Sequence, residues 1–377
     1  MTALAPPVAA APAAPALAPV RSPGYYVRQR LWQNKPAVVG LGFIALCALV
    51  ALLGYWVLPD NSPNANHGFV QLQKQEPGLR VVFRQAPLPA AVRASQPAPN
   101  PFTTWLAGCP PAYAETPVAA SIPGLVGPAP GGSPPARTTT RTIARTTART
   151  YWLGTDQAGR DTLSRLLLGT RVSLGIGLVA VVISLLLGTA VGAVAGYFGG
   201  WVDAALLGLM TVVWSIPGIM LVIAISLALD SKGVWVSFVA VGLTMWVDVA
   251  RVVRGQVLGL RAATFIEAGR VLGLPPARLI ARHLLPNLRG PLIVLATSNF
   301  AAAILLEAGL SFLGLGVQPP APSWGLMVKE GYDLLGTRAG LWLTGLPGVA
   351  ISLLVLSFNV VGNGLRDAYD PKTPVAG

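Results

Sequence analysis

Long apolar runs, separated by short polar segments, fill the second half of the chain and occur once near its beginning. Five runs are nearly free of charge, at residues 36–59, 172–202, 204–229, 290–306 and 339–365. A sixth run at 233–247 extends to Ala250 if Asp248 lies at a membrane interface. A spanning helix needs about 20 apolar residues, because the hydrocarbon core of a bilayer is about 30 Å thick. The pattern therefore predicts an all-α membrane protein with six transmembrane helices.

Glycine and proline mark where these runs turn or bend. Asp203 is the only charge between the second and third runs and follows Gly199 and Gly200, which predicts two helices joined by a tight turn. Pro217 interrupts the third run and Pro347 the last. Because proline kinks a helix, each of these helices either lines a path or packs against its neighbours. The first run is too long for a signal-peptide core, so we expect an uncleaved anchor.

Composition and charge agree with a membrane protein. The chain is 53% hydrophobic and only 11% charged, whereas a soluble domain carries roughly 25% charged residues. A net charge of +13 would suggest nucleic acid in a soluble protein, but here basic residues mark cytoplasmic loops, and we expect no nucleic-acid partner. The loop 251–289 holds seven arginines against Glu267 alone. We therefore expect this loop, both termini and the tail 366–377 to be cytoplasmic, and residues 1–35 to be a disordered cytoplasmic segment.

Residues 60–150 differ from the rest of the chain. They are rich in Pro, Ala and Thr, and they predict a long, partly irregular external loop rather than a packed domain. Within it Arg137, Arg141, Arg145 and Arg149 recur at every fourth position, as a solvated tract or as a helix that lies on anionic headgroups. Residues 151–171 predict a short amphipathic helix that enters the second span, with Asp161 near its start. This helix either anchors the span or contacts an external partner.

Few ionisable groups fall inside the predicted spans. Asp203, Asp248 and Glu307 all lie near predicted ends. Glu307 is either an interfacial acid at the outer end of span five or a buried carboxylate with a function. Small polar residues that are candidates to line a path are Thr211, Ser215, Thr244, Ser298 and Asn299.

Two other function classes are disfavoured by the sequence. A membrane-embedded enzyme needs clustered catalytic side chains, yet the two histidines, His67 and His283, fall in different compartments. The two cysteines, Cys47 and Cys109, also fall in different media, so we expect neither a disulfide nor a metal site. An ion-coupled transporter would show inverted repeats and intramembrane carboxylates. The chain also lacks a Gly-rich ATP-binding loop of the G-x-x-x-x-G-K-[ST] type.

The polar segment 267–287, EAGRVLGLPPARLIARHLLPN, predicts two helices joined by a corner. A first helix starts near Phe265. Gly273 ends it, because glycine accepts the left-handed conformation of a helix cap, and Pro275 or Pro276 begins the second helix. In a membrane protein, such a segment offers a soluble partner a rigid element to act on.

Three motifs together resemble one transporter family. LGTDQAGRDTLSRLLLGTRVSL precedes span two, EAGRVLGLPPARLIARHLLPN fills the cytoplasmic loop, and EAGLSFLGLGVQPPAPSWG follows span five. Their order resembles the second permease type of the dipeptide, oligopeptide and nickel branch of ATP-binding-cassette (ABC) importers. In that family the middle motif is the EAA loop. The resemblance covers roughly residues 153–371. Gly269 replaces the usual Ala, and the segment 60–150 is longer than usual.

The resemblance implies a type I importer permease without its own catalytic or metal site. The expected partners are a second homologous permease, two ATPase subunits, an external solute-binding protein and membrane lipids. ATP and Mg²⁺ are used by the ATPases, and this chain binds no cofactor. The transported solute is a peptide, nickel or a related small solute. The residues expected to dock the ATPase are Glu267, Ala268, Gly269, Arg270, Gly273, Leu285 and Pro286.

Overall fold

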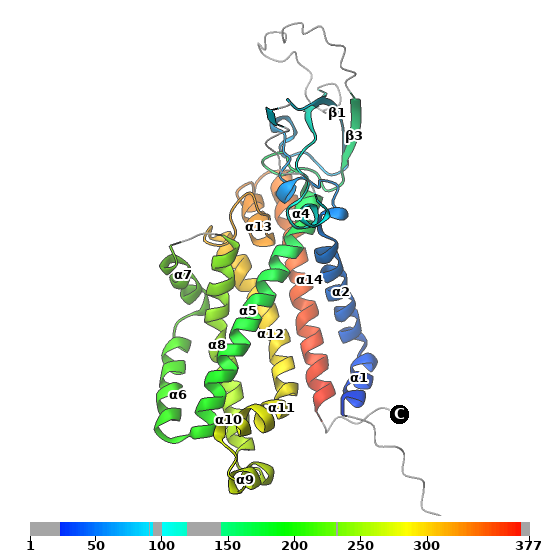
Figure 1. The fold of residues 1–377 in the computed structure, drawn as a ribbon. Helices are drawn as coiled ribbons and strands as arrows, with labels where there is room; N and C mark the ends of the chain where they lie inside the picture. The colour runs from blue at the N-terminus through cyan, green and yellow to red at the C-terminus, as the bar shows by residue number, and fades with distance from the viewer. Residues whose placement is uncertain (1–22, 90, 93–99, 119–144, 231–232, 371–377) are drawn as a thin grey trace, which may run out of the picture.

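The computed structural model describes residues 23–89, 91–92, 100–118, 145–230 and 233–370. It is an elongated helical bundle with a small sheet at one end (Figure 1). In this part of the chain, five helices are long and apolar enough to cross a membrane, and a bent pair makes six if it counts as one span. The five are α2 (Lys35–Leu53), α5 (Thr162–Phe198), α8 (Val234–Leu260), α12 (Arg289–Phe312) and α14 (Arg338–Tyr369).

The bent pair is α6 (Gly200–Trp214) and α7 (Gly218–Ala228), whose axes differ by 92°. Pro217 precedes α7 and is its N-terminal flanking residue, so the predicted kink is a complete break. The predicted tight turn before α6 is confirmed, because Gly199 and Gly200 have φ of +67° and +55°. Pro347, by contrast, lies inside α14, which continues to Tyr369.

Two predicted boundaries are wrong. Residues 151–171 do not form a separate entry helix, because α5 begins at Thr162 and runs unbroken to Phe198. Asp161 is its N-cap and accepts a hydrogen bond from the Ser164 amide at 3.0 Å. The helix of the fourth apolar run does not end near Asp248, because α8 continues to Leu260. Asp248 therefore lies near the middle of a helix about 40 Å long.

Small residues bring α5 and α8 into close contact. Gly188, Gly192 and Gly196 lie one turn apart on α5 and face α8. A Cβ atom at Gly196 would lie 2.8 Å from Cβ of Val257. Small residues let helix backbones approach closely in membranes, where packing drives association. The α5–α8 pair is thus a tightly packed central element of the bundle.

One end of the bundle, called the outer end below, carries a three-stranded antiparallel sheet in the order β2-β1-β3. The strands are β1 (Leu79–Pro87), β2 (Tyr113–Pro117) and β3 (Arg145–Tyr151). One face covers a buried apolar cluster of Phe69, Leu72, Val81, Phe83 and Tyr151. The described part of residues 60–150 is therefore a small packed subdomain, and the prediction of an irregular loop is wrong for it.

The arginine repeat is not helical where it is described. Arg145 and Arg149 lie on β3, in register with Gln85 and Val81 of β1, and Arg149 pairs with Glu115 at 3.4 Å. The headgroup-binding helix is therefore wrong for these two residues. Arg137 and Arg141 lie outside the described residues.

Short helices join these parts, and both ends of the described chain meet at the end of the bundle opposite the sheet (Figure 1). Arg30 of α1 (Pro23–Gln33) donates to the Asp370 carbonyl at 2.6 Å. Residues 23–33 are thus helical, which corrects the prediction of disorder for that part of 1–35; residues 1–22 lie outside the described part. The remaining outer elements are η1 (Gly54–Trp56), η2 (Pro63–Ala65), η3 (Val70–Leu72), α4 (Pro101–Ala107) and α13 (Trp324–Tyr332).

Candidate functional site

The predicted helix–corner–helix segment lies at the end opposite the sheet (Figure 1). Its first helix, α9 (Thr264–Val271), starts where the sequence predicts. At the corner Gly273 has φ +72°, its amide donates to the Arg270 carbonyl at 2.9 Å, and the Leu274 amide donates to the Gly269 carbonyl at 3.1 Å. Pro276 is the first residue of α10 (Pro276–Leu279). A π-helical turn, η5 (Ile280–Leu284), and α11 (Leu285–Asn287) lead into α12.

The inner face of this segment holds the corner together. Gly269 and Ile266 are buried, and a Cβ atom at Gly269 would lie 2.6 Å from Cδ2 of Leu279. Gly269 therefore packs α9 on α10 within the chain and does not face outward with Ala268. Leu285 and Pro286 are half-buried.

The opposite face of this segment is exposed and partly apolar. Glu267, Ala268 and Arg270 are exposed, as predicted docking residues should be. Beside them Val271 is 88% exposed, Leu272 78% and Phe265 46%. We define Phe265, Ala268, Val271 and Leu272 as the docking patch. The sequence analysis does not include Val271 and Leu272 among the docking residues. Two apolar residues just before a helix-ending glycine, inside a polar segment, are the sequence signal that could have identified them.

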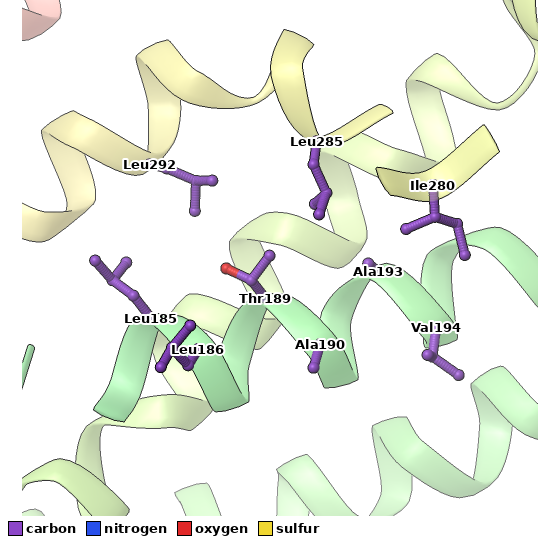
Figure 2. A pocket seen from close by; sticks show the side chains of 9 residues that line it. All are labelled: Leu185, Leu186, Thr189, Ala190, Ala193, Val194, Ile280, Leu285 and Leu292. Atoms are coloured by element: carbon purple, nitrogen blue, oxygen red, sulfur yellow. The ribbon is translucent and has the colours of Figure 1, made fainter. Parts of the chain in front are cut away.

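Leu285 connects the segment to the bundle. It lines an apolar groove of about 410 Å³ between α5 and the start of α12 (Figure 2). Ile280 of η5 and Leu185, Ala193 and Leu292 line the same groove. On the other side, the Arg270 guanidinium lies over the Tyr197 ring, 5.2 Å from its centroid. The segment therefore contacts α5 directly, both at Leu285 and at Arg270.

Four of the five candidate path residues lie on one accessible face of α6, α8 and α12. Thr211, Ser215 and Ser298 are exposed and Thr244 is half-buried, whereas Asn299 is only 6% exposed and lies on the buried side of α12. Along α8 the accessible positions recur at helical spacing and are mostly small or polar: Thr244, Asp248, Val252, Gly255, Gln256 and Gly259. Two hollows follow this face, one of about 250 Å³ at Thr244 and one of about 570 Å³ at Ser298.

Polar contacts hold the broken span against α8. Arg254 binds Asp203 through two hydrogen bonds of 2.5 and 2.7 Å. One turn earlier on α8, the Arg251 guanidinium lies 4.4 Å from the centroid of the Trp214 ring and donates to Thr211 at 3.5 Å. The indole nitrogen of Trp214 donates to Asp248 at 3.2 Å.

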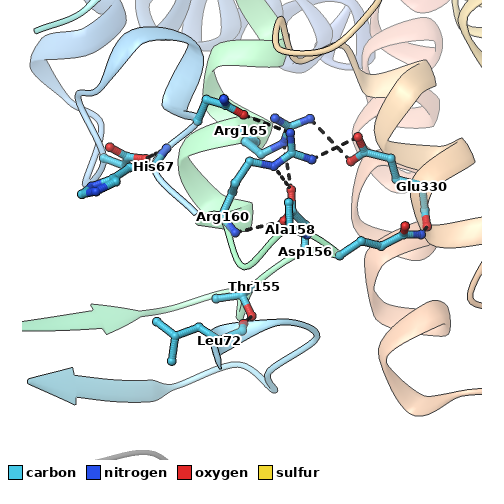
Figure 3. Close-up of polar contacts among 11 residues, drawn as sticks. His67, Leu72, Thr155, Asp156, Ala158, Arg160, Arg165 and Glu330 are labelled. Carbon is cyan, nitrogen blue, oxygen red and sulfur yellow. Dashed lines mark hydrogen bonds and ion pairs between the residues drawn. The ribbon is translucent and has the colours of Figure 1, made fainter. Parts of the chain in front are cut away.

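At the outer end, an ion-pair cluster joins the second-span motif to α13 (Figure 3). Asp156 accepts from Nε of Arg160 at 2.6 Å and lies 3.3 Å from Nε of Arg165. The two guanidinium groups also meet Glu330 of α13, at 3.1 and 3.5 Å. The Arg165 side chain is fully buried. The motif that precedes the second span therefore contacts α13 of the same chain. For this segment the sequence predicts either an anchor of the span or a contact with an external partner.

Burial perturbs two groups beside this cluster. Burial raises the pKa of the Tyr151 phenol to about 12, because the charged form loses hydration. Burial also raises the pKa of Asp161, while hydrogen bonds from the Ser164 side chain and amide act in the opposite direction. The outer subdomain thus excludes water from the start of α5.

Glu307 is buried, so its interpretation as an interfacial acid is wrong. Only 1% of the residue is exposed. Its carboxyl oxygens accept hydrogen bonds from Ser311 at 2.8 Å and from Ser173 of α5 at 3.4 Å. The second alternative, a buried carboxylate, holds, and the hydroxyl partners supply the hydrogen bonds that burial of such a group requires.

Comparison with known families agrees with this architecture. Residues 188–374 match the family described as "Binding-protein-dependent transport system inner membrane component". Residues 22–77 match "N-terminal TM domain of oligopeptide transport permease C". The oligopeptide transport system permease protein OppC of Bacillus subtilis is 39% identical over 222 residues, which are 59% of this chain and 72% of that protein. The chain belongs to the binding-protein-dependent transport permeases.

Other relatives are named for different substrates. The glutathione transport system permease protein GsiD of Pectobacterium atrosepticum is 40% identical over 224 residues, 59% of this permease and 73% of the relative. The dipeptide transport system permease protein DppC of Bacillus subtilis is 40% identical over 222 residues, 59% and 69% of the two chains. A structure of the MetNI methionine ABC transporter aligns with TM-score 0.46 and 20% identity over 55% of this permease and 97% of that chain.

Proposed function

We propose that this permease is one half of the membrane channel of an ATP-driven importer of peptides. A second, homologous permease supplies the other half, two ATPase subunits bind inside, and a solute-binding protein delivers peptides outside. The relatives named for oligopeptide, dipeptide and glutathione transport support this substrate class. Both ends of the described chain, at α1 and at the end of α14, are then cytoplasmic, because they share an end of the bundle with α9.

The docking patch is the observation that carries the proposal. It exposes four apolar residues on a rigid corner beside Glu267 and Arg270, at the end opposite the sheet. Contiguous exposed apolar surface rimmed by polar residues marks a site of protein association. An ATPase that binds there acts on α9, and the groove contacts of Leu285 carry its movement to α5.

The accessible face of α8 supports the other half of the proposal. Charged side chains inside membrane spans face the bundle interior or a water-filled cavity, because exposure to lipid is costly. Asp248 and Arg251 lie on this face, together with Thr211, Ser215 and Thr244. The face, which includes Ser298 of α12, is therefore the wall of the translocation path, and the second permease closes the path.

The decisive experiment places a charge in the docking patch. Leu272→Asp should abolish co-purification of the ATPase subunits and peptide-stimulated ATP hydrolysis in liposomes. The matched control is Trp32→Asp in α1, which is 62% exposed at the same end but lies outside the patch. Normal ATPase binding by Leu272→Asp, or equal loss in the control, would remove the support for this docking surface.

Membrane orientation is tested separately. Single cysteines at Gln85 in β1 and at Arg278 in α10 should react with an impermeant thiol reagent from opposite sides of the membrane. Labelling of Arg278→Cys from outside the cell would reverse the proposed topology.

A further inference from the structure

The hollow at the break between α6 and α7 has a chemical character that the general path does not explain. It measures about 250 Å³ and lies among α6, α7, α8 and α12. Its lining is mixed: Leu221, Met245 and Leu306 are apolar, Thr244 and Trp214 carry polar groups, and Asp248 is the one acidic residue. Asp248 is exposed on the path face. A small hollow with a mixed lining and a single carboxylate therefore opens toward the proposed path.

The carboxylate is held in place but not neutralised. Its described hydrogen bond comes from the Trp214 indole at 3.2 Å, and within the described residues no arginine forms an ion pair with it. Arg251 lies over the Trp214 ring, 4.4 Å from the centroid. Arg251 thus acts as a positioning residue, because it stacks on the indole that donates to Asp248.

We propose that this hollow is a transient binding site for the α-ammonium group and first side chain of a passing peptide. The ammonium binds Asp248, and the first side chain packs against the apolar part of the lining, at Leu221, Met245 and Leu306. A charge-assisted hydrogen bond is about twice as strong as a neutral one, so the Asp248 carboxylate favours an ammonium group over a neutral donor. This inference rests on the proposed path and adds a specific recognition step to it.

The same residues disfavour metal ions as the ligand. A divalent cation needs several oxygen, nitrogen or sulfur donors, and in the described part of the chain no group of three or more such side chains is assembled. The hollow contains one carboxylate and a lining that is partly apolar. An alkylammonium matches that lining, because it needs one anion and buries its carbon atoms.

The first test measures ligand protection in the assembled complex without its binding protein, in nanodiscs. Ser215→Cys places a thiol on the exposed stretch between Trp214 and Pro217, in a Cys109→Ser background. Trialanine should slow its labelling, N-acetyl-trialanine should not, and adding Asp248→Asn should remove the protection by trialanine. Equal protection by the two peptides, or protection that survives Asp248→Asn, would overturn the proposal.

The second test measures import into liposomes with the binding protein saturated by trialanine. A hydrogen bond to a charged group implies that Asp248→Asn lowers import about ten- to a hundredfold, while Asp248→Glu retains most of it. Wild-type-like import by Asp248→Asn would contradict the site, and so would equal loss in both variants. Peptide-stimulated ATP hydrolysis by the wild-type complex tests the importer function itself, so failure of the site and failure of the proposed function are distinguishable.

Discussion

Replacing Gly273 with valine is expected to weaken ATPase binding through backbone conformation alone. Gly273 has φ +72°, and a Cβ atom added there meets nothing within 4 Å. No clash with neighbouring atoms therefore contributes to the effect. The left-handed conformation costs a non-glycine residue roughly 1–2 kcal/mol, and β-branched residues adopt it least readily.

The expected affinity change follows from that cost. If only the left-handed corner presents the docking patch correctly, the apparent dissociation constant rises as the competent fraction falls. A cost of 1–2 kcal/mol corresponds to roughly a five- to thirtyfold weaker complex. Gly273→Asn should show a smaller effect, because asparagine tolerates this conformation better than other residues.

The assay titrates purified ATPase against the permease in nanodiscs. A matched control is Gly24→Val in α1, where an added Cβ also meets nothing within 4 Å and no positive φ is present. The expected order of affinity is wild type and Gly24→Val, then Gly273→Asn, then Gly273→Val. Equal affinity of all four proteins would refute the role of the corner, and equal weakening by valine and asparagine would refute the conformational explanation.

Three further predictions concern the outer end. Arg165→Met should lower the melting temperature of the complex by less than the equivalent of the about 3–5 kcal/mol that an unpaired buried charge costs, because Arg160 still pairs with Asp156 and Glu330; an unchanged melting temperature would contradict the role of the cluster. The Tyr151 phenol has a folded pKa of about 12, so its stabilising effect is complete below pH about 10 and is lost as pH rises toward 12. Protease resistance of the sheet should fall over this range in the wild type but not in Tyr151→Phe, and parallel loss in both would refute it. Deleting residues 119–144 should preserve assembly, whereas deleting 117–148 should expose the sheet to protease because it removes most of β3.

The helical part of the fold was predictable because hydropathy is a local signal. The number of spans, the Gly199-Gly200 turn and the start of α9 all follow from residues close together in sequence. The sheet was not predictable in this way, because β1 pairs with residues 145–151, more than 60 positions away. Its local signal is limited to the alternation of Leu79, Val81 and Phe83.

The errors within the spans have one physical cause. The fourth apolar run ends at the first charged residues. The helix α8 nevertheless continues, because those charged residues contact side chains of α6. Arg254 binds Asp203, and Arg251 stacks on Trp214. For Glu307 the sequence leaves an interfacial and a buried position open, and the structure selects the buried one, where Ser173, which is 134 positions away, donates to it. A sequence shows the charge, whereas the partner that makes burial acceptable comes from the tertiary structure.

The docking residues were partly predictable. Glu267, Ala268, Arg270 and Gly273 are exposed at the corner as expected, but the direction of each side chain depends on how α9 packs on α10. That packing turns Gly269 inward onto Leu279. It leaves Val271 and Leu272 outside.

The uninterrupted length of α5 has a mechanical consequence. Its 37 residues make a rod about 55 Å long, well beyond the thickness of the hydrocarbon core. Near its inner end α5 lines the apolar groove that also contains Leu285. At its outer end Arg165 forms an ion pair with Glu330 of α13. Spin-label distances between the outer end of α5 and α13 should stay constant through the transport cycle, and a change would show that this ion pair opens. If this helix tilts as a rigid body by about 10°, one end moves about 10 Å relative to the other. A conformational change on one side of the membrane then displaces the same helix on the opposite side.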